Sequence, residues 1–174
     1  MLEEYPDYRV FWSTAQLRGS CVFEIFPGDF AGEVTWGNRG SAYIQDVAFE
    51  PFIEILRAIA PHFDWNGETG LDRRASVRLI GRLEVLADSI NRARKVSDLH
   101  AAFGNRRLRI EEGAALVCRA RLRTMIPDLH YLAQTAIDRR TGLCCWDCDM
   151  ECDGTGAFRF SRATVLGSQI DSAS

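Results

Sequence analysis

The chain has 174 residues, of which 47% are hydrophobic and 26% are charged, proportions that suit one globular domain with its own core. Its first residues, MLEEYPDYRV, lack the basic and apolar regions of a signal peptide, and no apolar run approaches the roughly 18 residues that a membrane span needs. We therefore expect a cytoplasmic protein without a membrane segment, whose six cysteines are reduced thiols.

The net charge of −3 is unevenly distributed along the chain. Residues 1–70 hold 11 acidic and 4 basic residues, residues 71–141 hold 8 and 15, and residues 142–174 hold 5 and 2. The acidic and basic segments either neutralise one another in the fold or leave two surfaces of opposite sign, each able to attract a charged partner.

The first third of the sequence predicts four short antiparallel strands. The segments YRVFWS (8–13) and CVFEIF (21–26) alternate between two faces, and EVTW (33–36) and SAYIQDV (41–47) follow with turn signals between them. Connections this short are typical of a meander, in which each strand pairs with the next. We expect the four tryptophans, Trp12 among them, to belong to the core.

After residue 50 the apolar residues recur at helical spacing. Residues 50–60 predict a helix with Pro51 in its first turn. Residues 71–94 give the longest helical pattern, preceded by Thr69 and Asp72 in the arrangement of a weak capping box. These segments predict amphipathic helices in the centre of the chain.

The region after the long helix is harder to interpret. Ser97 is placed to cap a short helix that ends near Gly104. Residues 105–124 have helical propensity, but apolar and basic residues alternate over their second half, and we favour strands there. A helix is then expected over residues 128–140, with Asp128 as its N-cap.

The segment CCWDCDMECDG (144–154) contains four cysteines and four carboxylates. Its residues alternate with a period of two, and the turn sequence DGTG leads into a second alternating run. This predicts an antiparallel hairpin over residues 143–165. The apolar side of its first strand comprises Cys144, Trp146, Cys148, Met150 and Cys152, and the acidic side comprises Asp147, Asp149, Glu151 and Asp153.

The hairpin geometry argues against a metal site. Residues on the same side of a strand lie about 6.6 Å apart, whereas the ligands of one zinc ion must approach within about 4 Å of one another. A knuckle around Cys145 and Cys148 with His100 or His130 remains the alternative. A calcium loop fails because Phe160 occupies the position of the bidentate glutamate. We expect neither a metal nor another cofactor.

Two groups of arginines form candidate phosphate-binding rows. One lies on the long helix and the other on the expected strands. An isoelectric point near 5.6 and the lack of a nucleic-acid-binding motif argue against a nucleic-acid partner. The first group is Arg74, Arg78 and Arg82, and the second is Arg119, Arg121 and Arg123.

Signals for catalysis are few. The three histidines are far apart in the sequence, and the spacings typical of hydrolases, phosphate-binding loops and dinucleotide-binding folds are missing. Cys118 on an apolar segment is more typical of a core residue than of a nucleophile. The sequence therefore favours a protein that is not an enzyme.

These patterns predict a single α+β domain over residues 1–168, with an N-terminal antiparallel β-meander, central amphipathic helices and a C-terminal β-hairpin. Residues 169–174 are expected to form a frayed tail.

The acidic side of the hairpin is the candidate binding site. Asp147, Asp149, Glu151 and Asp153 suit a partner protein with a basic surface, and the plain alternative is a solvated face neutralised by Arg159 and Arg162. The leading hypothesis is a non-enzymatic inhibitor of the immunity type, which neutralises a basic partner such as a bacterial nuclease toxin. A small enzyme or ligand-binding domain with a site built from scattered residues, and an adaptor or chaperone, are the alternatives.

Overall fold

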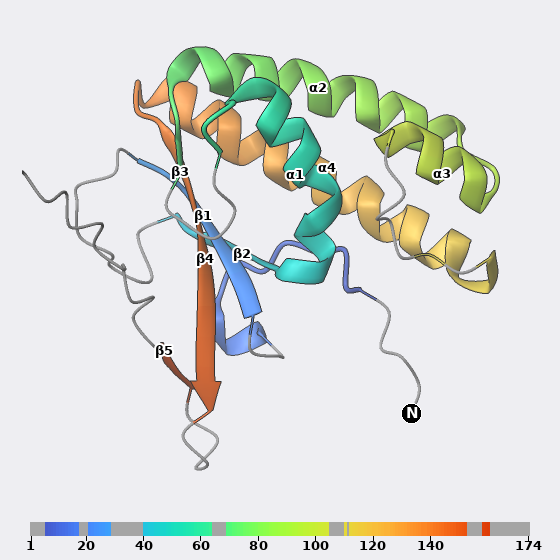
Figure 1. The fold of residues 1–174 in the computed structure, drawn as a ribbon, viewed down its shortest axis with the longest axis horizontal. Coiled ribbons are helices and arrows are strands. Elements are labelled where there is room, and N and C mark those ends of the chain that lie inside the picture. The colour runs from blue at the N-terminus through green and yellow to red at the C-terminus, as the bar shows by residue number, and fades with distance from the viewer. Residues whose placement is uncertain are drawn as a thin grey trace, which may run out of the picture.

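The computed structural model describes residues 6–17, 21–28, 40–63, 69–104, 110, 112–152 and 158–160, with the backbone alone for Thr69, Glu112, 146–152 and 158–160. Within these residues, four α-helices pack on an antiparallel sheet (Figure 1). The α+β class expected from the sequence is confirmed. No helix in the described part of the chain is long and apolar enough to cross a bilayer.

The sheet brings together strands from both ends of the sequence. Its order is β2-β1-β4-β3, with every pairing antiparallel, and β5 pairs with β4 alone. β1 and β2 are neighbours, as a meander requires, but the second neighbour of β1 is β4, which is reached through all four helices. The strands are β1 (Cys21–Pro27), β2 (Ala42–Gln45), β3 (Thr69–Leu71), β4 (Leu143–Cys152) and β5 (Phe158–Phe160).

The alternating residues of β1 are buried on both faces of the sheet. Phe23 and Ile25 belong to the main core beneath the helices, where the rings of Phe23 and Phe49 lie 4.5 Å apart. Glu24, on the opposite face, is also buried and accepts a hydrogen bond of 3.4 Å from the Tyr43 hydroxyl. A smaller core lies on that face, made of Phe11, Leu17, Val22, Phe26, Tyr43 and Cys144.

The expected strand over residues 8–13 does not form. Phe11 makes a single bridge to Tyr43 through two backbone hydrogen bonds of 2.8 Å. The chain then turns away, because the Ser13 hydroxyl accepts a hydrogen bond from the Ala15 amide and begins a short 3₁₀ helix, Thr14–Gln16. The expected strand over residues 33–36 lies outside the described residues.

The first two helices begin at different places from those expected. β2 ends at Gln45 because α1 (Asp46–Ile59) starts there, so Pro51 lies in the second turn rather than the first. α2 (Arg73–Arg92) matches the expected long helix closely. Its N-cap is Asp72 alone, whose carboxylate accepts a hydrogen bond of 2.7 Å from the Ala75 amide.

α3 (Val96–Phe103) confirms the expected short helix but has a different cap. Ser97 lies inside the helix. The carboxylate of Asp98 instead accepts hydrogen bonds from the backbone amides of Arg94 and Lys95, at 2.8 and 3.2 Å. Gly104 ends the helix with a φ of 63°, the left-handed conformation expected at this position.

The preference for strands within residues 105–124 was wrong from Ala115 onward. One helix, α4 (Ala115–Asp138), spans that segment and the helix expected over residues 128–140. Pro127 and Asp128 therefore lie inside a helix rather than at its start. The physical reason is a buried stripe at helical spacing that runs through both segments and outweighs the local alternation: Cys118, Leu122, Met125, Ile126, Leu129, Leu132, Ala133 and Ala136.

The C-terminal hairpin expected over residues 143–165 is confirmed for the backbone of residues 150–152 and 158–160. Residues 143–149 pair with β1 and β3, and residues 161–165 lie outside the described residues. β4 and β5 pair antiparallel, with Met150 opposite Phe160 and Cys152 opposite Phe158. The turn expected at residues 153–156 and the tail at residues 169–174 lie outside the described residues.

Candidate functional site

The four carboxylates on the acidic side of the hairpin form what we call the acidic row, and its first half lies inside the sheet. Asp147 and Asp149 are in the part of β4 that pairs with β1, directly opposite Phe23 and Cys21. Phe23 is 1% exposed and packs against Phe49 of α1. Asp147, the first acidic residue of the row, therefore lies beside a buried phenylalanine of the neighbouring strand.

The second half of the row lies where β4 extends past its neighbours (Figure 1). In the part of the chain that the structure describes, residues 150–152 pair with β5 alone. Glu151 is opposite Arg159, one of the two arginines expected to neutralise the row. The side chains of residues 146–152 and the whole of Asp153 lie outside the described residues. The acidic row as a docking surface therefore remains a prediction.

The buried cysteines are placed as core residues. The Cys144 thiol donates a hydrogen bond of 3.2 Å to the Gly28 carbonyl. Burial, with the neighbouring Cys144 second, raises the pKa of Cys145 far above its usual value, and burial also raises the pKa of Cys118. A thiol whose pKa is raised stays protonated and reacts slowly, so neither group is prepared for nucleophilic chemistry.

Within the described residues, no three His, Cys, Asp or Glu side chains gather closely enough to hold a metal ion. His62 follows α1, His100 lies in α3 and His130 lies in α4, where its Nε2 is 3.7 Å from a carboxylate oxygen of Glu84. The alternative zinc knuckle also requires the Cys148 side chain, which lies outside the described residues.

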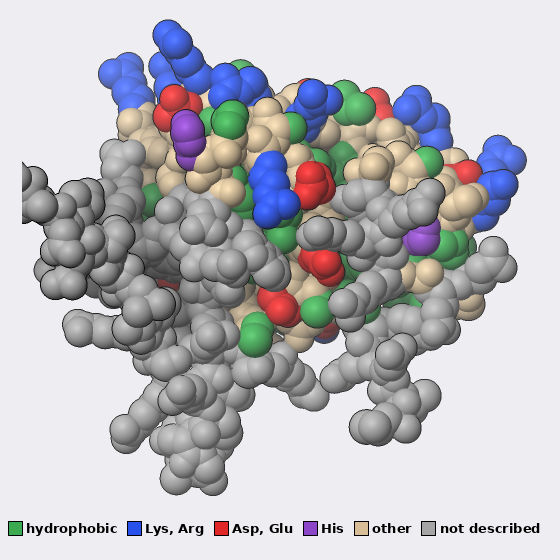
Figure 2. Space-filling model, viewed as in Figure 1, with side chains coloured by type: hydrophobic (Ala, Val, Ile, Leu, Met, Phe, Trp, Pro, Cys, Tyr) green, Lys and Arg blue, Asp and Glu red, His purple; other side chains and the backbone are tan. Residues whose placement is uncertain are grey.

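The first arginine row forms an exposed ridge on α2, along the side of the molecule where Figure 2 shows basic side chains gathered. Arg74 and Arg82 project from it. Arg78 lies between them and connects α2 to α1, since its Nη2 donates a hydrogen bond of 2.9 Å to the backbone carbonyl of Ile59 at the end of α1.

The prediction of a second arginine row was wrong, because its members lie on a helix, where residues two positions apart point to opposite sides, so Arg121 points away from Arg119 and Arg123. Arg119 is half-buried, and its Nη1 donates a hydrogen bond of 2.6 Å to the Ala93 carbonyl. Arg121 lies 3.4 Å from the carboxylate of Asp7, and Arg123 is exposed. Two of the three arginines therefore join elements of the fold.

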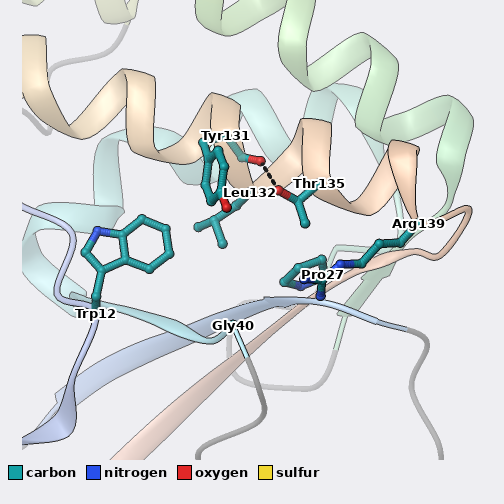
Figure 3. Close-up of a pocket in the computed structure, with 7 residues that line it drawn as sticks. All are labelled: Trp12, Pro27, Gly40, Tyr131, Leu132, Thr135 and Arg139. Carbon is teal, nitrogen blue, oxygen red and sulfur yellow. Dashed lines mark hydrogen bonds between the residues drawn. The ribbon is translucent and has the colours of Figure 1, made fainter.

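A site that the sequence did not indicate lies between α4 and the sheet. It is a cavity of about 330 Å³, with α4 on one side and the ends of β1 and β2 on the other (Figure 3). Tyr131, Thr135 and Arg139 line it from α4 and the residue that follows the helix, while Pro27 and Gly40 line it from the sheet. We call this cavity the aromatic cleft.

Two exposed aromatic side chains form one end of the aromatic cleft. The rings of Trp12 and Tyr131 meet edge to face, with their centroids 5.9 Å apart. Trp12 is 44% exposed and Tyr131 is 61% exposed, so the expectation that Trp12 is a core residue was wrong. The Arg139 side chain reaches toward Pro27 at the other end (Figure 3).

The signal for Tyr131 was present in the sequence. It lies off the buried stripe of α4, which passes through Leu129 and Leu132 on either side of it. Trp12 had no such signal, because its exposure follows from the turn at Ser13.

Comparison of the chain with known proteins identifies no family. The chain matches no family model, no curated protein and no solved structure.

Proposed function

We propose that the protein is a non-enzymatic binding module, an inhibitor of the immunity type that neutralises a basic partner protein such as a nuclease toxin. The proposal rests on one feature, the extension of β4 beyond the sheet. Among the described residues, its last residues pair only with β5, and they carry the second half of the acidic row. A hairpin that projects from the fold is accessible to a partner, and its carboxylates suit a basic surface.

Within the acidic row, the register separates Asp147 from the other three carboxylates, and we expect the two parts to have different roles. Asp147 is opposite a buried phenylalanine, whereas Asp149 pairs with the first residue of β1 and Glu151 lies beyond it. We therefore assign most of the binding to Asp149, Glu151 and the Asp153 that follows. Loss of a carboxylate from a buried ion pair with the partner costs about 2–5 kcal/mol, and loss of one at the rim mainly slows association.

The experiment compares tagged wild-type protein with the double variant Asp149→Asn, Glu151→Gln. Both are immobilised and exposed to extracts of the cells that produce the protein, at low and high salt. We expect the wild type to retain one basic protein in stoichiometric amount and to release it at high salt. The variant is expected to retain much less of it, and calorimetry with the purified partner gives the change in affinity.

The matched control removes two charges elsewhere. Glu54→Gln with Asp88→Asn changes exposed carboxylates on α1 and α2 and is expected to bind the partner like the wild type. Equal loss of binding in both double variants would show that net charge alone matters, and undiminished binding by the hairpin variant would leave the acidic row as a solvated face.

The stability of the free protein provides a second test. Like charges along one strand repel, so the triple variant Asp147→Asn, Asp149→Asn, Glu151→Gln is expected to melt at the same temperature as the wild type or slightly higher. The proposal places these carboxylates at the surface, where the loss of a charge changes stability by only about 0–1 kcal/mol. Unfolding of the triple variant would mean that the carboxylates are paired within the fold.

A ligand-binding domain is the second candidate function. The aromatic cleft favours it, because the cleft joins residues from distant parts of the chain in the manner expected of a site built from scattered residues.

A further inference from the structure

We propose that the aromatic cleft binds a small aromatic carboxylate. This inference rests on the second candidate function and names its ligand class. It is independent of the proposed inhibitor function, since it concerns another part of the molecule and a free small molecule rather than a protein. It rests on the shape of the cleft, the chemistry of its two ends and its size.

The aromatic end of the cleft suits a flat ring. Trp12 and Tyr131 lie edge to face and remain largely exposed, so each keeps ring surface available for a third ring. Aromatic groups pack favourably when their centroids are about 4.5–7 Å apart. Leu132, which is buried beneath them, gives the cleft an apolar floor.

The opposite end suits a carboxylate. Arg139 is exposed, and within the described residues its guanidinium has no ion-pair partner. Among the described residues that line the cleft, none is acidic. A guanidinium binds a carboxylate through two parallel hydrogen bonds, which also fix the orientation of the anion.

The end of α4 does not oppose the binding of an anion there. The last carbonyls of a helix carry partial negative charge when they are unpaired. Here the carbonyls of Thr135, Ala136 and Ile137 accept hydrogen bonds from the amides of Arg139, Thr141 and Arg140, at 2.9–3.0 Å. The positive charge of Arg139 therefore dominates this end of the cleft.

The size of the cleft limits the ligand to one ring with a short acidic arm. A volume of about 330 Å³ is close to the lower limit of known ligand pockets, roughly 300 Å³. Phenylacetate has the ring and the charge that the two ends of the cleft suit and is small enough for this volume, so it serves as the probe.

The experiment titrates the protein with phenylacetate and two molecules of nearly the same shape, neutral phenylacetamide and cationic phenethylamine. Binding is followed by NMR shifts of backbone amides in α4. We expect a dissociation constant on the order of 1 mM for phenylacetate, binding about fivefold weaker for the amide, and none for the amine.

Two variants of cleft residues and one control variant locate the site. Arg139→Gln is expected to weaken phenylacetate binding to the level of the amide, whereas Arg123→Gln, an exposed arginine of the same helix outside the cleft, is expected to change nothing. Tyr131→Leu is expected to weaken both aromatic probes. Both cleft residues are exposed, and unchanged melting curves verify that the variants fold.

The proposal is overturned by equal affinity for all three probes, by the absence of saturable phenylacetate binding up to about 20 mM, or by an effect of Arg123→Gln as large as that of Arg139→Gln. Tighter binding of a peptide ending in phenylalanine would assign the cleft to a protein chain instead. The hairpin variant Asp149→Asn, Glu151→Gln is expected to bind phenylacetate normally, so failure here is distinct from failure of the proposed function.

Discussion

The guanidinium of Arg119 in α4 donates a hydrogen bond of 2.6 Å to the backbone carbonyl of Ala93, the residue that caps the end of α2. The last carbonyls of a helix have no partner within it and are negatively polarised, so an arginine from another helix satisfies them well. Arg78 does the same for Ile59 at the end of α1. Arginine side chains thus link the C-terminal ends of α1 and α2 to neighbouring helices.

Replacement of Arg119 by alanine should lower stability. A hydrogen bond from a charged group contributes about 1.5–3 kcal/mol, and Arg119 is half-buried, so we expect a loss of about 1–2 kcal/mol in the free energy of unfolding. The measurement is urea denaturation, with Arg123→Ala as the control because Arg123 is exposed on the same helix. Equal losses in the two variants would mean that helix charge, and not the bond to Ala93, is responsible.

Replacement of Asp72 by alanine should remove the N-cap of α2. The hydrogen bond of 2.7 Å from the Ala75 amide to the Asp72 carboxylate satisfies one of the first amides of that helix. Loss of such a cap typically costs about 1 kcal/mol. Asp88→Ala, an exposed aspartate within the same helix, is the control and is expected to change the melting temperature much less. A larger effect at Asp88 would refute the capping role.

The stability contributed by Asp98 should depend on pH. The backbone hydrogen bond from Arg94 is the main cause that lowers the pKa of Asp98 in the folded protein, with the bond from Lys95 adding to it. The unfolded value is about 3.9, so the contribution is complete above that pH and is lost as the pH falls through the folded value. Asp98→Asn should therefore be less stable than the wild type near about pH 6, and the difference in urea midpoint should shrink below about pH 4. A difference that persists in acid would contradict a role for the charge.

The thiol of Cys145 should resist alkylation in the folded protein. Burial raises its pKa far above the ordinary thiol value, and its side chain is 2% exposed. Cys21, at the start of β1, is half-buried and is expected to react first among the cysteines whose side chains are described. Mass spectrometry of peptides after timed treatment with iodoacetamide distinguishes the sites, and full modification of Cys145 before unfolding would show that β4 opens readily.

The elements that the sequence predicted well are those with a single clear period. In α2, Leu79, Leu83, Leu86 and Ile90 fall on one face and allow no strand interpretation. α4 was missed at its start because Leu116 and Val117 are apolar yet 69% and 53% exposed, which disguises the helical stripe. Local alternation then matched a strand equally well, and only packing against α2 decides the outcome.

The aromatic cleft could not be predicted from the chain alone. Trp12 lies far in the sequence from Tyr131 and Arg139, and the three belong to no common motif. They meet because the segment before β1 makes a single bridge to β2 and then turns toward α4. For the acidic row, the sequence alone predicts which residues belong to it. The pairing of those residues with β1 and β5 depends on the register of the sheet and could not be predicted.

The position of β4 affects how the protein folds while it is being synthesised on the ribosome. β1 pairs on one side with β2, which follows soon after it, but its other partner is made only after residues 143–149 have been synthesised. Contacts between residues so distant in sequence form slowly, because a long loop must close before the pairing stabilises it. The helices α2 and α3 are complete well before that point and can fold first. Until β4 arrives, one edge of β1 remains open to pairing with other chains, so the nascent protein depends on the last part of its sheet to prevent aggregation.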